Sequence, residues 1–283
     1  AGTTSGLFRL QSATGGTPTF EPVAGIKETV WALVSRPGAL WIGAQSGLFS
    51  LSGKEVKQEA KAEVVYDLSF SPKNENVLYL ATRTQGMRWV KGEKGWEKTG
   101  EVASSGQEFR TVAEDADGRV WFTTRNGILL ADFSKQPAAV ESFGENEGLP
   151  PGWKNIFRVG GTLRFATEKG LVRYVAASRK FVPETAMGTM FADGSHGVLL
   201  MREDSAQNIW ISGAGYHGVM DIAKNWRPMP FLSAGLDEIW ALQADRDGVV
   251  WAFGPDGRLI RAEMTRDPAA EPFRIQIRRL QAG

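Results

Sequence analysis

The feature that most constrains this chain is a short motif that recurs at nearly regular intervals. Each copy is an apolar run around one large side chain, followed by a polar turn with glycine and a second apolar run. The large side chains align at Trp41, Tyr79, Trp121, Arg164, Trp210 and Trp251. Successive positions are 38, 42, 43, 46 and 41 residues apart. A partial copy opens the chain, because "AGTTSGLFRL" aligns with "IGAQSGLFSL".

A repeat of this length predicts the fold. Each full copy contains an apolar strand, then the strand with the large residue, then a third strand and a more polar fourth one. Four strands in a period of about 40–45 residues are typical of a β-propeller blade. One such sheet cannot bury both faces, whereas stacked sheets bury each face against the next. We therefore expect an all-β protein, a β-propeller of about seven four-stranded blades, with Trp side chains filling the gaps between blades.

The repeat also predicts how the chain divides. The expected blade units are 1–25 (partial), 26–61, 62–104, 105–150, 151–190, 191–234 and 235–270, with 271–283 remaining. Because Ala1 falls on the position of Ile42, the first blade is expected to be incomplete and to lack its inner half. In 271–283, Phe273, Ile275 and Ile277 alternate with polar residues, as in a strand.

Composition excludes several partners. The 33 basic and 32 acidic residues give a net charge of +1, so nothing in the charge favours nucleic acid or an anionic membrane surface. The chain has no cysteine, which excludes disulfides and thiolate metal sites. No apolar run approaches the roughly 18 residues of a transmembrane helix. We expect no cofactor, no nucleic acid partner and no membrane contact by this segment.

One acidic turn has the look of a calcium loop. It contains Asp115, Asp117 and Gly118. An EF-hand loop has Gly at its sixth position and acidic ligands at its first and twelfth. With Gly118 at the sixth position, the first is Ala113 and the twelfth is Thr124, and neither is acidic. We therefore expect no metal, and predict a tight primed hairpin turn in which Asp117-Gly118 supplies the positive φ.

The stretch "DGRVWFTTRNGILLAD" (117–132) resembles the repeats of periplasmic sensor propellers of bacterial two-component regulators. Those repeats carry Asp, Gly, an apolar residue, Trp, an apolar residue, a small residue and Thr, then Gly-Leu and an apolar strand. The matching residues are Asp117, Gly118, Val120, Trp121, Phe122, Thr124, Gly127 and Ile128. Other copies match at Trp41, Ile42, Gly43, Gly47 and Leu48, and at Ile209, Trp210, Ile211 and Gly218. One copy departs from the pattern, with Arg164 in place of Trp.

The resemblance implies a function as well as a fold. Members of that family are followed by an immunoglobulin-like module, a transmembrane helix and a histidine kinase or diguanylate cyclase. The chain is then expected to be a periplasmic, non-catalytic part of an inner-membrane receptor that senses a ligand or relays a signal. Segment 271–283 is expected to be the last outer strand or the first strand of the immunoglobulin-like module. A homodimer formed through the parent receptor is a further expectation.

Aligned first strands place several recognition residues near the entrance of the expected channel. These are Trp31, Tyr66, Arg110, Asn155 and Trp240. Aromatic rings and a guanidinium group suit a sugar, a peptide or an aromatic acid, by stacking and bidentate contact. The alternative is that the tryptophans pack between blades, because a slip of one residue moves a side chain to the other face.

Turns between second and third strands are expected on the same rim. They carry Gln45, Arg83, Arg125, Lys169, Tyr216 and Asp256. The repeat does not dictate Arg125, which makes it a candidate contact for an anionic ligand. Counted from the aligned tryptophan to the closing glycine, the copy with "GAGYHG" is two residues longer than the copy with "IGAQSG". Tyr216 and His217 are therefore expected to protrude, either to contact a ligand or as a plain exposed loop.

Two rival functions remain open. A propeller enzyme, a lyase or glycoside hydrolase, would need an acid–base set such as His217 with Glu145 or Glu147 from "GENEGLPPG" (144–152), which is otherwise an ordinary connection. A scaffold for partner proteins or dimerisation would need apolar outer strands. Segment "KEVKQEA" (54–60) is polar instead.

Overall fold

The regular structure of this chain is almost entirely β. The computed structural model describes residues 1–11, 19–103, 106–244, 249–255, 258–263 and 275–279. Its one α-helix in these ranges, α1 (Pro230–Gly235), is accompanied by three single-turn 3₁₀ helices. No helix in the described part is long and apolar enough to cross a bilayer. The chain forms two compact units, Ala1–Ser142 and Phe143–Gly283, each described by itself.

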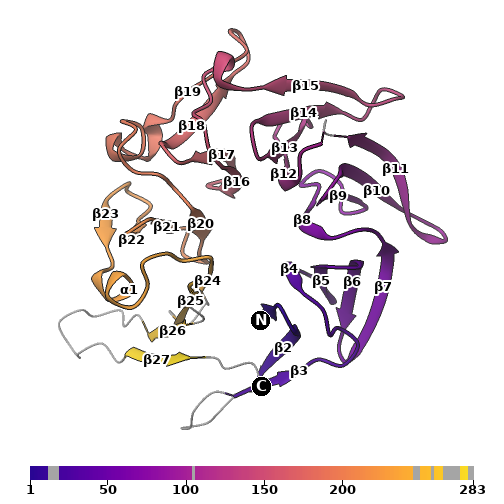
Figure 1. Cartoon of the computed structure of the whole chain (residues 1–283), viewed down its shortest axis with the longest axis horizontal. Helices are drawn as coiled ribbons and strands as arrows, with labels where there is room; N and C mark the ends of the chain where they lie inside the picture. Colours follow the sequence, from indigo (N-terminus) through magenta and orange to yellow (C-terminus); the bar gives the residue numbers. More distant parts are fainter. Residues whose placement is uncertain (12–18, 104–105, 245–248, 256–257, 264–274, 280–283) are drawn as a thin grey trace. The chain divides into compact units, whose positions relative to one another are not determined.

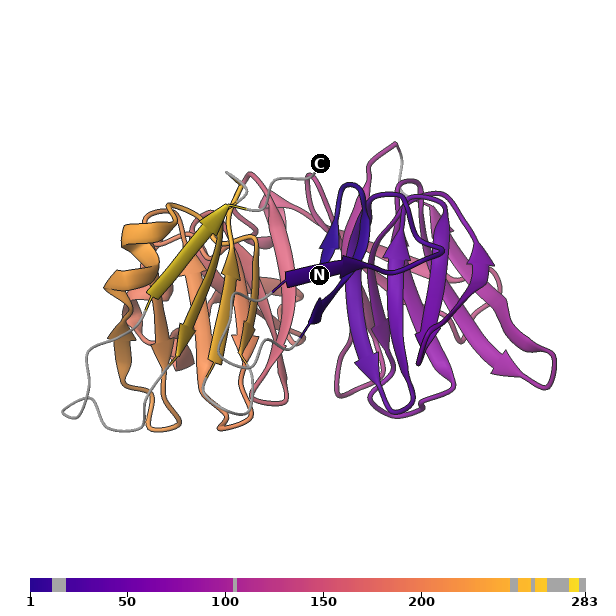
Figure 2. The same cartoon turned by 90° about the horizontal axis from the view of Figure 1, so that it is seen from below.

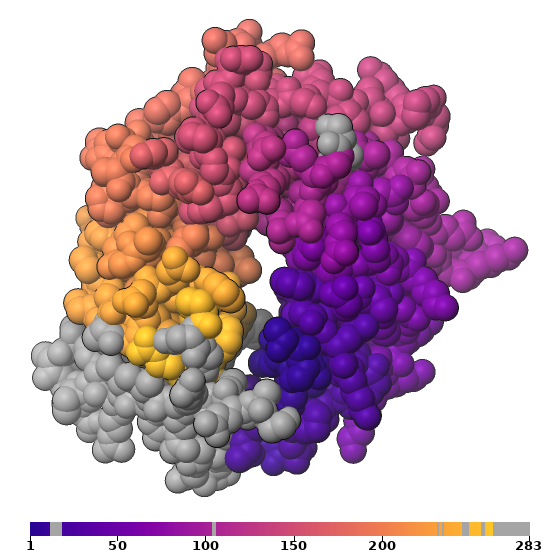
Figure 3. Space-filling view, viewed as in Figure 1, coloured from indigo at the N-terminus to yellow at the C-terminus, as the bar shows by residue number. Residues whose placement is uncertain are grey.

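The first unit contains four antiparallel sheets in chain order (Figure 1). Their strands are β1 (Gly2–Thr3), β2 (Gly6–Gln11) and β3 (Thr19–Pro22); β4 (Val30–Arg36), β5 (Ala39–Ala44), β6 (Gly47–Ser52) and β7 (Glu55–Lys61); β8 (Val65–Phe70), β9 (Val77–Thr82), β10 (Gln85–Gly92) and β11 (Gly95–Ala103); and β12 (Phe109–Glu114), β13 (Val120–Thr124), β14 (Ile128–Asp132) and β15 (Ala139–Phe143). The tip of the β10–β11 hairpin stands out from the molecular surface (Figure 3).

The second unit contains three further sheets of the same kind. Their strands are β16 (Lys154–Val159), β17 (Thr162–Thr167), β18 (Gly170–Val175) and β19 (Lys180–Pro183); β20 (Leu200–Glu203), β21 (Ile209–Gly213), β22 (Tyr216–Met220) and β23 (Trp226–Pro228); and β24 (Ala241–Ala244), β25 (Val249–Phe253), β26 (Arg258–Glu263) and β27 (Ile275–Arg279). The 3₁₀ turns are η1 (Glu145–Glu147), η2 (Thr185–Met187) and η3 (Thr189–Phe191). β27 pairs antiparallel with β26 as the fourth strand of its sheet.

The predicted fold class is confirmed. The described residues form seven sheets, six with four strands and one with three, which are the blades of an all-β propeller. The three-stranded sheet is the first one, β1-β2-β3, as expected from the partial first repeat. In that alignment β1 corresponds to β5, so the first strand of this blade is the one that the described residues do not contain.

Strand alternation in the second strands explains why the repeat carries a large residue. Trp41 packs with Leu68 and Leu78 of the following sheet, whereas its neighbour Ile42 packs with Leu7 of the preceding one. Successive side chains of a strand point to opposite faces, so one strand serves two interfaces. In Figure 2 the sheets of the first unit run side by side. The predicted role of the tryptophan, filling the gap between blades, is confirmed at Trp41.

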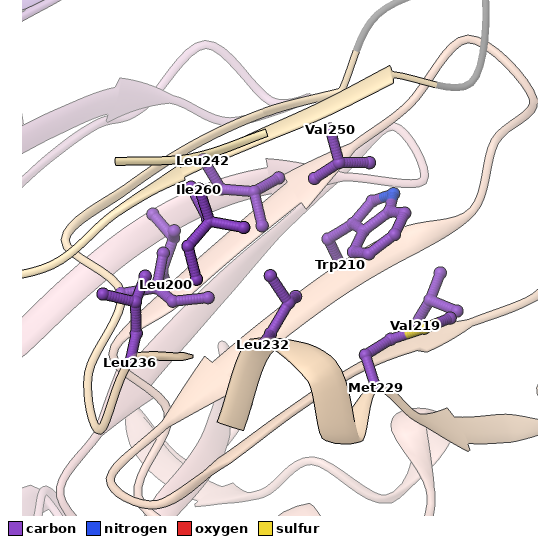
Figure 4. Packing of buried hydrophobic residues seen from close by; sticks show 11 residues of the cluster. Leu200, Trp210, Val219, Met229, Leu232, Leu236, Leu242, Val250 and Ile260 are labelled. Atoms are coloured by element: carbon purple, nitrogen blue, oxygen red, sulfur yellow. The ribbon is translucent and has the colours of Figure 1, made fainter. Parts of the chain in front are cut away.

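The same packing recurs in the second unit. Trp210 of β21 contributes to a cluster with Val250 of the following sheet and with Leu232 of α1 (Figure 4). Arg164, which stands at the tryptophan position of its own sheet, forms a partly buried ion pair with Glu184 instead. The departure from the repeat is therefore compensated by a charge partner from the end of the same blade.

Close backbone approach explains the glycine that begins the third strand. Gly47 has a φ of +138°, and a Cβ there would lie 2.2 Å from the carbonyl oxygen of Ala60. Gly170 has a φ of +109°, and its Cβ would lie 2.3 Å from the carbonyl oxygen of Phe191. No side chain fits at such distances, so only glycine is accommodated at this turn.

The acidic turn is organised by one half-buried carboxylate. Asp115 accepts hydrogen bonds from the backbone N–H groups of Asp117 and Arg119 (2.9 and 3.0 Å), from Nε of Arg119 (2.7 Å) and from Nε1 of Trp121 (2.8 Å). Burial alone would raise its pKa, but these donors outweigh burial, and the pKa of Asp115 lies below its usual value. Asp115 thus closes the turn and orients the tryptophan.

The turn type differs from the prediction. The backbone N–H of Asp115 donates to the carbonyl of Arg119, which leaves three residues in the loop, and only its last residue, Gly118, has a positive φ (+86°). This is a three-residue loop with glycine in the left-handed region, not a two-residue primed turn. Asp204 repeats the arrangement, accepting from the backbone of Asn208 (2.9 Å) and from Nε1 of Trp210 (3.0 Å).

Removing either organising carboxylate is expected to destabilise the fold. Asp115→Ala or Asp204→Ala leaves an indole N–H and backbone donors unpaired, so the free energy of unfolding should fall by about 2–4 kcal/mol. The exposed neighbour Asp117 is the matched control, and Asp117→Ala should change it by less than about 0.5 kcal/mol. Urea titrations measure both. A calcium-dependent rise in melting temperature that Asp115→Ala abolishes would contradict this structural role.

A strained residue in the second of these turns is expected to be improvable. Gln207 occupies the place of Gly118 with a φ of +64°. A side chain in this region costs roughly 1–2 kcal/mol, partly offset by the greater unfolded-state freedom of glycine. Gln207→Gly should therefore raise the free energy of unfolding by about 0.5–1 kcal/mol. Ala206→Gly, which relieves no strain, should lower it, and equal effects of the two changes would refute the argument.

Candidate functional site

Three β-bulges mark the beginning of the first strands in the first unit. In the β4–β5 pair, Val30 faces Ala44 and Ala32 faces Gly43, so Trp31 is an extra residue. The β8–β9 pair has the same shift between Val65 and Asp67, which makes Tyr66 the extra residue. In the β12–β13 pair the shift falls between Phe109 and Val112, over Arg110 and Thr111.

A bulge bends the strand locally and redirects the side chain at the extra position. The three bulged positions include Trp31, Tyr66 and Arg110, the residues that alignment of the first strands singled out. Trp31 is 50% exposed, which is unusual for tryptophan in a first strand and leaves half of its surface available. Trp31 is therefore not fully buried between blades, as the predicted alternative would require.

The three side chains meet one another, because consecutive first strands β4, β8 and β12 are in contact. The rings of Trp31 and Tyr66 lie 5.2 Å apart in an edge-to-face arrangement, with an interplanar angle of 81°. The guanidinium carbon of Arg110 lies 4.7 Å from the centroid of the Tyr66 ring, on its face. Aromatic and cation–π contacts thus link three blades at one rim.

A carboxylate that the sequence analysis missed completes the group. Glu108 accepts hydrogen bonds from the hydroxyl of Tyr66 (3.1 Å) and from Arg110. Nε of Arg83, from the turn between β9 and β10, lies 3.9 Å from the same carboxylate. We name Trp31, Tyr66, Arg83, Glu108 and Arg110 the rim cluster. The available signal for Glu108 was its place two residues before Arg110, at the same strand start.

Polar residues just before the first strands hold two turns that carry arginines. Glu63 accepts from the backbone N–H of Thr84 at 2.8 Å, and so holds the turn that carries Arg83. Gln107 accepts from the backbone N–H of Asn126 at 3.2 Å and holds the turn that carries Arg125 in the same way. Arg125 itself is exposed, and its contact with an anionic ligand stays a prediction.

The candidate residues of the second unit take part in separate contacts. Asn155 donates through Nδ2 to the carbonyl of Leu199 (3.3 Å), and the hydroxyl of Tyr216 donates to the carbonyl of Gly197 (2.9 Å). Trp240 is 61% exposed, and its Nε1 donates to Glu238 at 3.1 Å. Of these side chains, only Trp240 presents a large free surface. Asp256, named with the rim turns, lies outside the described residues.

The expectation that His217 protrudes over the rim is wrong. Gly213 pairs with Tyr216, so the turn is only two residues long, and strand alternation sends His217 inward, where it is 2% exposed. Its Nε2 lies 2.9 Å from the carbonyl oxygen of Leu236, which can only accept, so Nε2 carries the proton. Nδ1 then accepts from the hydroxyl of Ser212 at 2.9 Å.

These contacts bear on the proposed acid–base set. Both ring nitrogens of His217 are engaged inside the blade, and Glu147 accepts from the backbone N–H of Gly144 (2.8 Å) to close its own turn. The chemistry expected of a general base needs a nitrogen or carboxylate facing substrate. Among the residues that the structure describes, no group of three or more His, Asp or Glu side chains could hold a metal ion.

His217 is expected to make the fold sensitive to acid. Burial lowers its pKa from the usual 6.5, and the hydrogen bond to Leu236 opposes this only in part. The unfolded chain therefore takes up the proton first, so the contribution to stability is complete above pH 6.5 and is lost as pH falls below it. His217→Gln, which can still donate and accept, should reduce the acid slope of the free energy of unfolding by up to about 1.4 kcal/mol per pH unit. Identical slopes in wild type and variant would contradict this.

Comparison with known proteins supports the recognised family. Residues 104–126 match the family model described as the two component regulator propeller. No curated protein gives a significant match to the sequence. The extracellular domain of the hybrid two component system BT4673 from B. thetaiotaomicron has a TM-score of 0.61, with 20% identity over 87% of this chain and 32% of that one. For the corresponding domain of BT3049 the TM-score is 0.56, with 13% identity over 82% and 33%.

Virginiamycin B lyase from Staphylococcus aureus is also similar, with a TM-score of 0.59 and 12% identity over 90% of this chain and 85% of that one. At such identities these likenesses establish the propeller fold and nothing further. The chain spans about a third of the length of the two-component relatives. The resemblance predicted from the sequence is matched at 104–126, where the chain carries a repeat of the two component regulator propeller kind.

Proposed function

We propose that this chain is an extracytoplasmic sensor propeller of a bacterial transmembrane signalling receptor, and that it binds a ligand at the rim cluster without catalysing a reaction. The family repeat at 104–126 and the similarity to extracellular domains of two-component systems support the receptor context. The observation that carries the binding proposal is the rim cluster, where Trp31 is half exposed beside Tyr66 and Arg110.

The side chains of the rim cluster suit recognition better than structural support. An exposed indole loses little conformational freedom when a flat ligand stacks on it, and guanidinium groups form charge-assisted hydrogen bonds with fixed geometry. Arg83 and Arg110 are 53% and 46% exposed, so both can reach a ligand. Sugars, peptides and aromatic acids all present surfaces of this kind.

The proposal extends to the parent receptor. A periplasmic location agrees with the similarity to extracellular domains. The proposal also includes a homodimer formed through that receptor, with the signal leaving through the C-terminal end of the chain. β27, paired with β26, is the last strand in the described part of that end. The similarity to virginiamycin B lyase does not favour an enzyme, because His217 is engaged inside its blade.

A ligand screen with a rim variant tests the proposal. Thermal shift and tryptophan fluorescence are measured against sugars, oligosaccharides, amino acids, peptides and aromatic acids. Trp31→Ala should weaken binding of any hit by about fivefold or more, since one stacked ring contributes on the order of 1 kcal/mol or more. Ile222→Ala, which removes another exposed apolar side chain (69% exposed), is the matched control and should leave affinity unchanged.

Two results would count against the proposal. One is a hit whose affinity is the same in wild type and Trp31→Ala. The other is the lack of any response in the intact receptor across all of these ligand classes.

A further inference from the structure

The carboxylate of Glu108 lies where three donors of the rim cluster converge. It accepts from the Tyr66 hydroxyl at 3.1 Å and from Arg110, and lies 3.9 Å from Nε of Arg83. Its side chain is 37% exposed, so water reaches the same place. An exposed carboxylate with this set of partners contributes little to stability. The position of Glu108 indicates a ligand class, because it shows that a carboxylate group fits between Tyr66, Arg83 and Arg110.

Arg83 has hydrogen-bonding capacity to spare beyond its contact with the Tyr66 side chain. A separation of 3.9 Å exceeds a hydrogen bond, so Glu108 attracts Arg83 by charge without satisfying its N–H groups. Glu63, the other carboxylate that acts on Arg83, is directed to the hydroxyl of Thr82 (3.3 Å) and the backbone of Thr84 (2.8 Å). A guanidinium group carries five N–H donors in a fork that matches a carboxylate.

We propose that the rim cluster is a carboxylate-recognition site and that Glu108 fills it when no ligand is bound. The ligand is a small organic acid with a flat apolar ring. Its carboxylate takes the place of Glu108 between Arg83 and Arg110, and its ring stacks on Trp31. This inference deepens the proposed function and rests on it, since it names the ligand class of the same site.

The aromatic members of the rim cluster are the reason for expecting a ring in the ligand. Trp31 meets Tyr66 edge to face, which holds the indole in position, and half of its surface stays exposed. A carboxylate without a ring would gain the arginine contacts but none of this apolar area. A flat ring without a carboxylate would stack but would leave Glu108 on Arg110. Only a ligand with both groups uses all members of the cluster.

Displacement of Glu108 has a structural consequence within its own blade. The preceding residue, Gln107, holds the β13–β14 turn through Thr124 and Asn126, and the following residue, Phe109, is fully buried in the core. Glu108 is therefore tethered on both sides, so its release acts on the start of β12 and on that turn. The bulge at Arg110 is the adjacent point at which the strand can adjust.

The variant Glu108→Gln separates this inference from simple rim binding. Benzoate and phenylacetate are titrated against the chain by tryptophan fluorescence and calorimetry, with benzamide as the uncharged probe. Glutamine keeps an acceptor for the Tyr66 hydroxyl but removes the competing charge, so carboxylate affinity should rise at least about fivefold. Arg83→Gln should lower it about tenfold or more, and benzamide should respond to neither change.

Glu238→Gln is the matched control, because Glu238 also contacts a residue two positions later, Trp240, in the second unit. It should leave carboxylate affinity unchanged, and near-identical melting temperatures exclude misfolding. Affinity that falls or is unaltered in Glu108→Gln overturns the inference. A ligand of another class that binds with dependence on Trp31, while no carboxylate binds, also overturns it but leaves the proposed function standing. If no probe or screened ligand binds with dependence on Trp31, both fail.

Discussion

Burial of the second strands on both faces is the constraint on which the rest of this structure depends. β9, β13 and β21 are buried at every position, so each needs an apolar neighbour on either side. Successive side chains of the strand point to opposite faces, so Trp41 and Ile42 pack against different sheets. The glycine that begins the third strand allows the close backbone approach at the turn. The carboxylate that accepts from the tryptophan indole holds that side chain in its place between the sheets.

Because the side chains of the second strands are buried between sheets, the first strands are where the chain can expose polar and aromatic side chains to a ligand. In the first unit each begins with a bulge, and the extra residues differ in kind: an indole, a phenol and a guanidinium group. A repeated backbone irregularity with variable side chains is how a scaffold of equal blades acquires one distinctive surface. In the second unit, β16–β17 and β24–β25 pair without such a shift, and Asn155 is used in an internal contact.

Most of the fold could be predicted from the sequence, but only part of the candidate site, because the fold follows from local patterns and the site also depends on contacts between distant residues. Period and alternation are local, so the sheets, the incomplete first blade and the role of Trp41 could be predicted. Aligning the first strands also singled out Trp31, Tyr66 and Arg110 as candidates, because a bulge recurs in the first strands of the first unit. His217 was misplaced because its face depends on where β22 begins, at Tyr216, a matter of one or two residues. Glu108 was missed because its partner Tyr66 is 42 residues away.

Amide hydrogen exchange with and without a screened ligand tests the central claim, that the bulged strand starts form the binding site, most directly. The account predicts that added protection concentrates at the starts of β4, β8 and β12 and in the turn that carries Arg83, because these backbone segments hold the contact residues. Exchange in the outer strands, such as β7 and β11, should be unchanged. Protection confined to outer strands or to the second unit would contradict the claim.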